Sequence, residues 1–364
     1  MKRFLTLLTL ILASQIANAG LFDGSQGEGT EISPYLIYIK ADLEELADSV
    51  NTKPNTWSIG KYFNLMNDIN DPVNTVIGGR LSFVDHYFQG NFDGQYYTIN
   101  LAITTTIPMA GLFGFVSNAV IKNVITRGYI NGNAFIGGIV GEAFENTTIT
   151  NCINLANLYA AGSYIGGILA NARYNVTVTN CINLGNVSVS NSYSSFIGGI
   201  VGMSWSPLSQ SITIMNCINA GVVKAPAIYT NNPSSIIQVG GILGYNLYDG
   251  AKIINCINVN VVEGPDELTS AIGGGSNVVN CHYDKQFCNH KGVNGVDIIG
   301  QAEGHLTRNM VGRKLASLLG DNDWTYVEGA TIYQSLYPQL KVLDHTNASK
   351  VGASPIFLYD GIKD

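Results

Sequence analysis

Charged side chains are scarce in this sequence. Asp, Glu, Lys and Arg together make up 12% of the residues, about half of the usual share for a soluble domain. The formal net charge is −7 at pH 7, and no stripe of basic residues interrupts this acidic balance. Nucleic-acid binding depends on a basic surface and is therefore not expected. Solubility has to come from Asn, Ser and Thr side chains and from backbone amides.

Long apolar stretches are missing too, and no segment after the N-terminus approaches the roughly 20 apolar residues that a transmembrane helix needs. One short apolar run lies at the start of the chain, preceded by Lys2 and Arg3 and followed by Ala17-Asn18-Ala19. This order predicts a signal peptide over residues 1–19, cleaved after Ala19, and a buried N-terminal helix is the alternative. We therefore expect an exported chain without a transmembrane segment, located at the cell surface or outside the cell, with the periplasm left open.

Familiar catalytic motifs are absent as well. The sequence has no H-E-x-x-H zinc motif, no G-x-S-x-G nucleophile elbow, no phosphate loop and no dinucleotide fingerprint. The acids between residues 137 and 281 lie scattered in the spacers without a recurring register, and we expect them to be solvated surface charges: Glu142, Glu145, Asp249, Glu263, Asp266 and Glu267. The sequence thus predicts no enzymatic activity, no cofactor and no bound metal.

One cluster of Cys and His leaves several interpretations open. Cys281, His282, Cys288 and His290 lie close together in the sequence. Zinc is one interpretation, although the usual C-x2-4-C spacing is not met and an exported protein is an unusual place for a thiolate site. A local disulfide between Cys281 and Cys288 is the second interpretation, and ordinary packing is the third.

Glycine and asparagine, in contrast, are abundant and recur in a fixed pattern. A Gly-Gly-Ile landmark begins at residues 137, 166, 198 and 240, and each copy is followed by Asn-Cys-Ile-Asn, beginning at residues 151, 180, 216 and 255. An altered copy of the second landmark is Asn280-Cys281-His282-Tyr283. The spacers between landmarks differ in length, which indicates that part of each repeat packs against its neighbours while another part forms variable loops.

Runs of strand length surround each landmark, rich in β-branched residues and bounded by Gly or Asn. Propeller blades need longer repeats, and the leucine ladder of a leucine-rich repeat is missing. The pattern therefore predicts an all-β chain folded as a right-handed parallel β-helix, a solenoid in which equivalent residues stack about 4.8 Å apart. Because a relaxed disulfide needs closer Cβ atoms, the stacked cysteines are expected to be buried free thiols: Cys152, Cys181, Cys217 and Cys256.

A solenoid exposes strand edges at both ends, so caps are expected. Residues 41–50 place Leu43, Leu46, Ala47 and Val50 on one helical face and predict a short N-terminal helical cap. An amphipathic helix at Met310–Leu319, stopped by Gly320, is expected to close the other end. The predicted organisation is an N-terminal cap with the first coils at 20–110, the repeat solenoid at 111–285, a C-terminal capping region at 286–343, and a linker or the start of a further strand at 344–364.

The order of these motifs resembles the GLUG-motif repeat proteins of Bacteroidetes-type bacteria, whose repeat is also found in a non-catalytic segment of some immunoglobulin A peptidases. The resemblance starts at Gly29-Thr30-Glu31-Ile32, continues through Gly111-Leu112-Phe113-Gly114 and both landmarks, and ends at Tyr337-Pro338-Gln339-Leu340. It implies a β-helix at the cell surface, commonly described as adhesin-like, with no agreed ligand. Ala170, where the pattern has Gly, departs from it.

Aromatic residues of the spacers, many of them beside Asn or Ser, are the candidates for ligand binding: Trp205, Tyr229, Tyr245 and Tyr248. Such side chains suit stacking on sugars or contact with a protein surface, and covering the corners of the coils is the alternative. We therefore expect an exported, non-catalytic, adhesin-like surface protein that presents spacer loops to a host or bacterial glycan or protein. A carbohydrate-active β-helix enzyme, either a polysaccharide lyase or a hydrolase, and a purely structural stalk are the alternatives.

Overall fold

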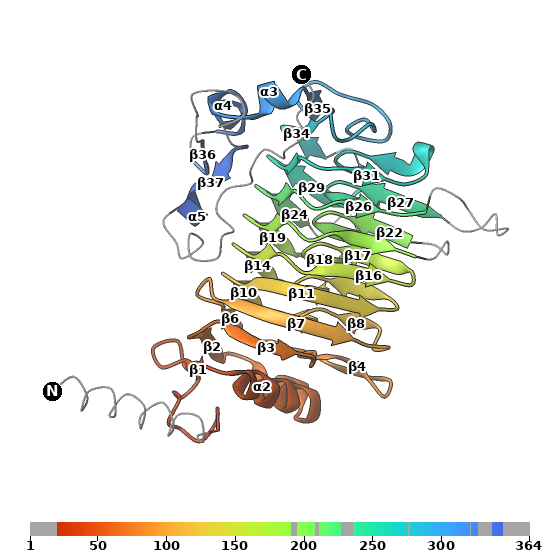
Figure 1. Cartoon of the computed structure of the whole chain (residues 1–364). Coiled ribbons are helices and arrows are strands. Elements are labelled where there is room, and N and C mark those ends of the chain that lie inside the picture. The colour runs from red at the N-terminus through yellow and green to blue at the C-terminus, as the bar shows by residue number, and fades with distance from the viewer. Residues whose placement is uncertain are drawn as a thin grey trace.

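The chain folds into a stack of short parallel strands, coil upon coil, that starts with the N-terminal segments and continues toward the later repeats (Figure 1). The computed structural model describes residues 20–190, 195–207, 211–226, 236–275, 277–320, 322–326 and 337–344. Successive coils pass through sheets that run along the stack, called here the first, second, third and fourth sheet in chain order. Neighbouring strands in these sheets pair in parallel, which confirms the prediction of an all-β parallel solenoid.

The first and second sheets lie on either side of the Asn-Cys landmarks. The first sheet contains β1 (Tyr35–Ile37), β2 (Tyr62–Leu65), β6 (Asn91–Asp93), β10 (Val120–Lys122), β14 (Thr148–Thr150), β19 (Thr177–Thr179), β24 (Ile212–Met215), β29 (Ala251–Ile254) and β33 (Val278–Val279). The second sheet contains β3 (Ile69–Val73), β7 (Thr98–Thr104), β11 (Ile125–Gly132), β15 (Ile153–Asn154), β16 (Asn157–Ala160), β20 (Ile182–Asn183), β21 (Val187–Val189), β25 (Ile218–Asn219), β26 (Val223–Lys224), β30 (Ile257–Asn258), β31 (Val262–Glu263), β34 (Cys281–Asp284) and β35 (Ala302–His305).

The third and fourth sheets lie on either side of the Gly-Gly landmarks. The third sheet contains β8 (Met109–Ala110), β12 (Phe135–Gly137), β17 (Ser163–Gly166), β22 (Ser195–Gly198), β27 (Ile237–Gly240) and β32 (Thr269–Ser270). The fourth contains β9 (Phe113–Ser117), β13 (Val140–Phe144), β18 (Leu169–Arg173), β23 (Val201–Trp205) and β28 (Leu243–Leu247). Outside these sheets, β4 (Gly79–Leu81) and β5 (Val84–His86) form an antiparallel hairpin, and η2 (Asp266–Leu268) is a short 3-10 helix.

A row of buried asparagines connects the two landmarks of each repeat. Asn154, Asn183, Asn219 and Asn258 are fully buried. The Nδ2 groups of the first three each donate a hydrogen bond to the Oδ1 of the next asparagine, at 2.8, 2.9 and 2.7 Å. The second glycine of each Gly-Gly pair faces this row, because a Cβ at Gly167 would overlap the Asn183 amide and the Gly199 carbonyl oxygen. The two landmarks thus form one packing unit.

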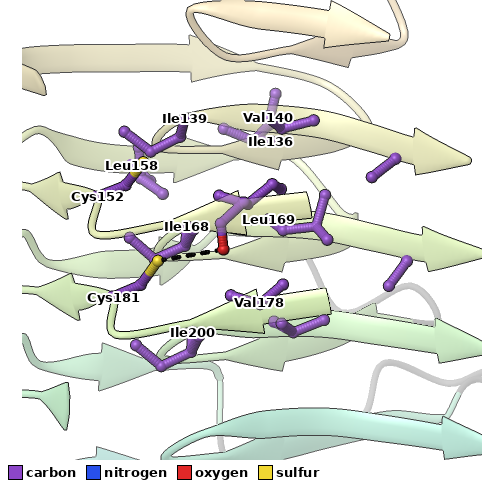
Figure 2. Packing of buried hydrophobic residues seen from close by; sticks show 14 of the residues in the cluster. Ile136, Ile139, Val140, Cys152, Leu158, Ile168, Leu169, Val178, Cys181 and Ile200 are labelled. Atoms are coloured by element: carbon purple, nitrogen blue, oxygen red, sulfur yellow. Dashed lines mark hydrogen bonds between the residues drawn. The ribbon is translucent and has the colours of Figure 1, made fainter. Parts of the chain in front are cut away.

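The cysteines also stack in a row, as expected. Cys152, Cys181, Cys217, Cys256 and Cys281 are buried in the main core, and all are free thiols, as is Cys288. The prediction of buried free thiols is confirmed, and the alternative of a Cys281–Cys288 disulfide is not realised. Figure 2 shows Cys152 and Cys181 in neighbouring coils, beside Ile139, Ile168 and Ile200 of the Gly-Gly-Ile landmarks.

The predicted N-terminal helix is present as α2 (Lys40–Thr52), followed by η1 (Asn55–Ser58). Leu43, Leu46, Ala47 and Val50 form its buried face, as the pattern indicates. The carboxylate of Asp42 accepts hydrogen bonds from the backbone N–H groups of Tyr38 and Ile39, which fixes the first turn. In Figure 1, α2 lies at the N-terminal end of the stack.

The C-terminal region differs from the prediction of one helix at Met310–Leu319. It contains α3 (Thr307–Met310), α4 (Arg313–Leu319), an antiparallel pair of β36 (Trp324–Thr325) and β37 (Gln339–Leu340), and α5 (Lys341–Asp344). Gly312, with a φ of 64°, separates α3 from α4. The region closes over an apolar strip on the outer face of the second sheet, which we call the isoleucine row and which consists of Ile125, Ile153, Ile182, Ile218 and Ile257.

The isoleucine row follows from strand alternation, because the residues on either side of each Ile, Cys and Asn in four coils and Val124 and Thr126 in the first, are buried on the opposite face. Four residues of the C-terminal region pack with the row in one buried cluster: Leu315, Trp324, Tyr337 and Leu340. The C-terminal region therefore covers the side of the solenoid, and its closure of the far end stays a prediction.

Some predictions fall on residues outside the described ranges. The predicted signal peptide at residues 1–19 is among them, as is all but the first residue of the predicted linker or further strand at residues 344–364. In the described ranges, the helices are too short or too polar to cross a membrane.

The packing of glycine against asparagine gives a first prediction. Replacing Gly167 by Ala should lower the free energy of unfolding by about 1–3 kcal/mol or more, because the new methyl group meets backbone that cannot move away. The matched control is Gly162→Ala in the same coil, where the nearest heavy atom would lie 3.7 Å from the new Cβ. Urea unfolding of both variants measures the difference, and equal midpoints would contradict the packing unit.

Candidate functional site

The outer faces of the third and fourth sheets carry three rows of side chains that run along the stack. The first row, on the third sheet, consists of Met109, Phe135, Tyr164, Phe196 and Gln238. The second row, on the fourth sheet, consists of Phe115, Glu142, Asn171, Met203 and Tyr245. The third row, also on the fourth sheet, consists of Ser117, Phe144, Arg173, Trp205 and Leu247. Each coil contributes one residue to each row, because the strands are in register.

The aromatic rings of the first row stack on one another, and Tyr245 of the second row extends the stack. The ring centroids are 4.7 Å apart for Phe135 and Tyr164, 5.2 Å for Tyr164 and Phe196, and 4.4 Å for Phe196 and Tyr245, and the rings are nearly parallel. The first two distances match the spacing of neighbouring strands. Since the ring faces cover each other, the stack forms a wall that presents ring edges to solvent.

Arg173 is packed among two aromatic rings of the third row and the ring of Tyr174, the next residue in the chain. Its guanidinium carbon lies 5.3, 5.6 and 4.6 Å from the ring centroids of Phe144, Tyr174 and Trp205, a cation–π arrangement. Tyr174 meets Trp205 edge to face at 4.6 Å, and Tyr248 approaches Trp205 at 6.2 Å. These contacts hold Arg173 and Trp205 in one orientation.

A cavity of about 300 Å³ opens between the rows. Its lining combines charged and amide side chains with aromatic and apolar ones: Arg80, Met109, Phe135, Glu142, Tyr164, Asn171, Arg173, Met203 and Trp205. A second hollow of about 550 Å³ continues along the rows, lined in part by Gln238, Tyr245, Asn246 and Asp249. We call the surface that includes both hollows the groove.

Glu142 is the buried carboxylate of the smaller cavity, so the prediction of a solvated surface charge is wrong for this residue. Only 2% of it is exposed. Its Oε1 accepts hydrogen bonds from Asn171 at 3.1 Å and from Arg173 at 3.3 Å. Burial raises the pKa of Glu142, and the positive charges of Arg173 and Arg80 oppose that rise. The sequence could not show this, because the partners lie in other coils.

Arg80 reaches the cavity from the β4–β5 hairpin. Its guanidinium forms a bidentate ion pair with Asp85, at 2.6 and 2.9 Å. The hydrogen bonds from Arg80 lower the pKa of Asp85. Two arginines from segments far apart in the sequence therefore meet at one cavity.

The structure brings together part of the predicted binding site. Trp205 lines the smaller cavity and Tyr245 the larger one, and Tyr248 lies beside Trp205 with 56% of its surface exposed. The expectation that they lie in spacer loops is wrong for Trp205 and Tyr245, because Trp205 ends β23 and Tyr245 is inside β28. Tyr229 lies outside the described residues.

Sequence reasoning missed Phe135, Glu142, Asn171 and Arg173 as members of the site. The fourth sheet carries a sequence signal that could have identified them. After each Gly-Gly-Ile landmark, apolar positions alternate with positions whose residue type differs from repeat to repeat. Glu142, Asn171, Met203 and Tyr245 occupy equivalent positions in successive repeats. Positions that vary within a fixed register point outward, and such positions are the natural place for a binding surface.

The Cys and His cluster of the last repeat separates in the structure. Cys281 belongs to the core row, and His282 contacts His305 instead, with Nδ1 and Nε2 3.0 Å apart. The Nε2 of His282 lies 3.0 Å from Asn280 Oδ1. Over the described ranges, no three Cys, His, Asp or Glu side chains converge in a way that could hold a metal ion.

The His282–His305 pair predicts a pH dependence of stability. Burial, and then the charge of His305, lower the pKa of His282 from 6.5 to about 4. Because the fold favours the neutral imidazole, its contribution is complete above pH 6.5 and is lost as the pH falls toward 4, by about 3 kcal/mol in total. His282→Gln should flatten this part of the pH profile in urea unfolding, with His290→Gln as the control. An unchanged profile in His282→Gln would contradict the assignment.

Comparison with known proteins shows a similar fold but does not assign the chain to a family. The chain superposes on a crystal structure from Bacteroides ovatus, described provisionally as an immunoglobulin A1 protease, with a TM-score of 0.62 and 18% identity over 88% of this chain and 96% of that one. A second structure, described as an IgA1 protease, gives a TM-score of 0.45 and 18% identity over 74% of this chain and 21% of that one. Since identity is low, the likeness to the Bacteroides ovatus structure concerns the fold alone.

Sequence comparison adds a partial relative. Halomucin of Haloquadratum walsbyi is 27% identical over 158 residues, which cover 34% of this chain and only 2% of halomucin. No family model matches the chain, so the resemblance to GLUG-motif proteins stays a prediction.

Proposed function

We propose that this chain is an exported, adhesin-like surface protein that binds a glycan in the groove and does not react with it. The observation that carries the proposal is the cavity of about 300 Å³ on the outside of the solenoid, in which charged and amide side chains lie beside aromatic rings. Sites for small ligands are concave and largely formed before the ligand binds, and a lining that combines polar groups with aromatic rings suits a ligand rich in hydroxyl groups. The proposal includes a right-handed solenoid of GLUG type, with α2 as its N-terminal cap.

The location outside the cell rests on the N-terminal sequence and on the comparisons. Residues 1–19 have the order of a signal peptide. The fold shared with the Bacteroides ovatus structure and the partial match to halomucin support the same location. A protein partner at the groove is the alternative to a glycan.

A carbohydrate-active enzyme is the second candidate, because Glu142 is a buried carboxylate with a raised pKa beside a cavity. General acids are often found in such a setting. Against this candidate, Glu142 Oε1 already accepts two hydrogen bonds and the side chain is only 3% exposed. A binding site with a structural carboxylate accounts better for this geometry.

The proposal predicts that glycan binding depends on Trp205. Residues 20–364 are applied to a glycan array, and the affinity for the retained glycans is measured by calorimetry. Trp205→Ala should weaken binding about tenfold or more, since it removes a wall of the cavity and the ring that orients Arg173. The control is Tyr129→Ala, which removes a tyrosine that is 45% exposed on β11, outside the groove.

Three outcomes would contradict the proposal. The first is that the wild-type chain retains no glycan. The second is that Trp205→Ala and Tyr129→Ala bind alike. The third is cleavage of a retained glycan, detected by new reducing ends, which would favour the enzyme; Glu142→Gln should then abolish the cleavage.

A further inference from the structure

The charges that line the smaller cavity are unequally accessible. Side-chain exposure is 44% for Arg80 and 33% for Arg173, but only 3% for Glu142. A ligand in the cavity therefore meets the two guanidinium groups, while the carboxylate lies beneath them. Asp85 balances part of the charge of Arg80 from the hairpin, outside the cavity lining.

Both guanidinium groups keep hydrogen-bond donors available. Each carries five N–H groups. Arg80 uses Nε and Nη2 on Asp85, and Arg173 uses Nη1 on Glu142. Among the described residues, the remaining N–H groups of both side chains have no acceptor. Unused donors on two arginines at one cavity are suited to an anion with two oxygens.

Arg173 is also fixed in place before any ligand arrives. The rings of Phe144, Tyr174 and Trp205 surround its guanidinium, and Glu142 holds it from below. A side chain that is already ordered loses little conformational entropy on binding. Glu142 thus acts as a positioning residue for Arg173.

We propose that the smaller cavity binds a sugar residue that carries an anionic group, either a carboxylate or a sulfate ester, with the anion between Arg80 and Arg173 and the sugar ring against Phe135 and Tyr164. This inference rests on the proposed function and names the ligand class of the same site. The cavity volume of about 300 Å³ is at the lower end of the range for small-ligand pockets, and fits one sugar residue.

The charge of the whole chain restricts the ligand further. The net charge is −7 at pH 7, so a long polyanion is repelled by the rest of the surface. The site is therefore suited to an isolated anionic residue, such as one at the end of a glycan chain.

The experiment compares matched sugars in calorimetry with the chain from residue 20. The methyl glycosides of glucose and galactose are the neutral ligands, and their uronates and 6-sulfates are the anionic ones. We expect at least one anionic ligand to bind about tenfold or more tightly than its neutral counterpart. Arg80→Gln should remove most of that preference, and Arg127→Gln, an exposed arginine on β11 that bonds Asn70, should keep it.

The outcomes separate this inference from the proposed function. Equal affinity for neutral and anionic ligands, or an unchanged preference in Arg80→Gln, overturns the anionic ligand class. If Trp205→Ala still abolishes glycan binding in that case, the groove remains the binding site. If no glycan binds on the array either, the proposed function itself fails. A preference for uronates alone, or for sulfates alone, supports the inference and identifies the source of the anion.

Discussion

The fit of a buried asparagine against a glycine holds the coils of this solenoid in register. Each of four buried asparagines occupies space that a Cβ on the facing glycine would fill: Asn154, Asn183, Asn219 and Asn258. A buried amide without partners would be costly, and here each Nδ2 bonds a backbone carbonyl oxygen in its own turn, while the first three also bond the next asparagine. A shift of one residue would break every bond in the row. Differences in repeat length are therefore confined to the spacers.

The same register determines how the outer surface is built. Because the core positions repeat without drift, each coil places one residue in each of the three rows. In the second row, the residue type changes from coil to coil, and the successive residues are Glu142, Asn171, Met203 and Tyr245. The core packing thus determines where the side chains of the groove lie, and the residue types in the rows determine which ligand groups they can bind.

Much of the fold could be predicted from the sequence, because its signals are local and repeated. The landmarks indicate short parallel strands, the position of Cys within them indicates a buried row, and the apolar spacing of residues 41–50 indicates the helix that is found at Lys40–Thr52. The predicted helix at Met310–Leu319 was only partly right, since Gly312 interrupts it.

The candidate site was harder to predict, because its contacts join different coils through spacers of unequal length. Nothing near Glu142 in the sequence indicates that Arg173 and Asn171 bury its carboxylate. Likewise, the Arg80 hairpin meets the cavity only in three dimensions. Trp205 and Tyr245 were identified by residue type, but their place in strands depends on how far each strand extends beyond its landmark.

A comparison of two outward surfaces of the solenoid explains why a partner is expected at the groove. The isoleucine row on the second sheet is apolar, and the chain covers it with its own C-terminal region, where Tyr337 also donates a hydrogen bond of 2.7 Å to the buried Asp284. The rows on the third and fourth sheets differ, since Phe135, Tyr164 and Arg173 remain only partly buried. An apolar strip left open would promote aggregation, whereas aromatic edges and guanidinium groups remain compatible with water. The groove can therefore stay accessible until a ligand of matching charge and shape fills it.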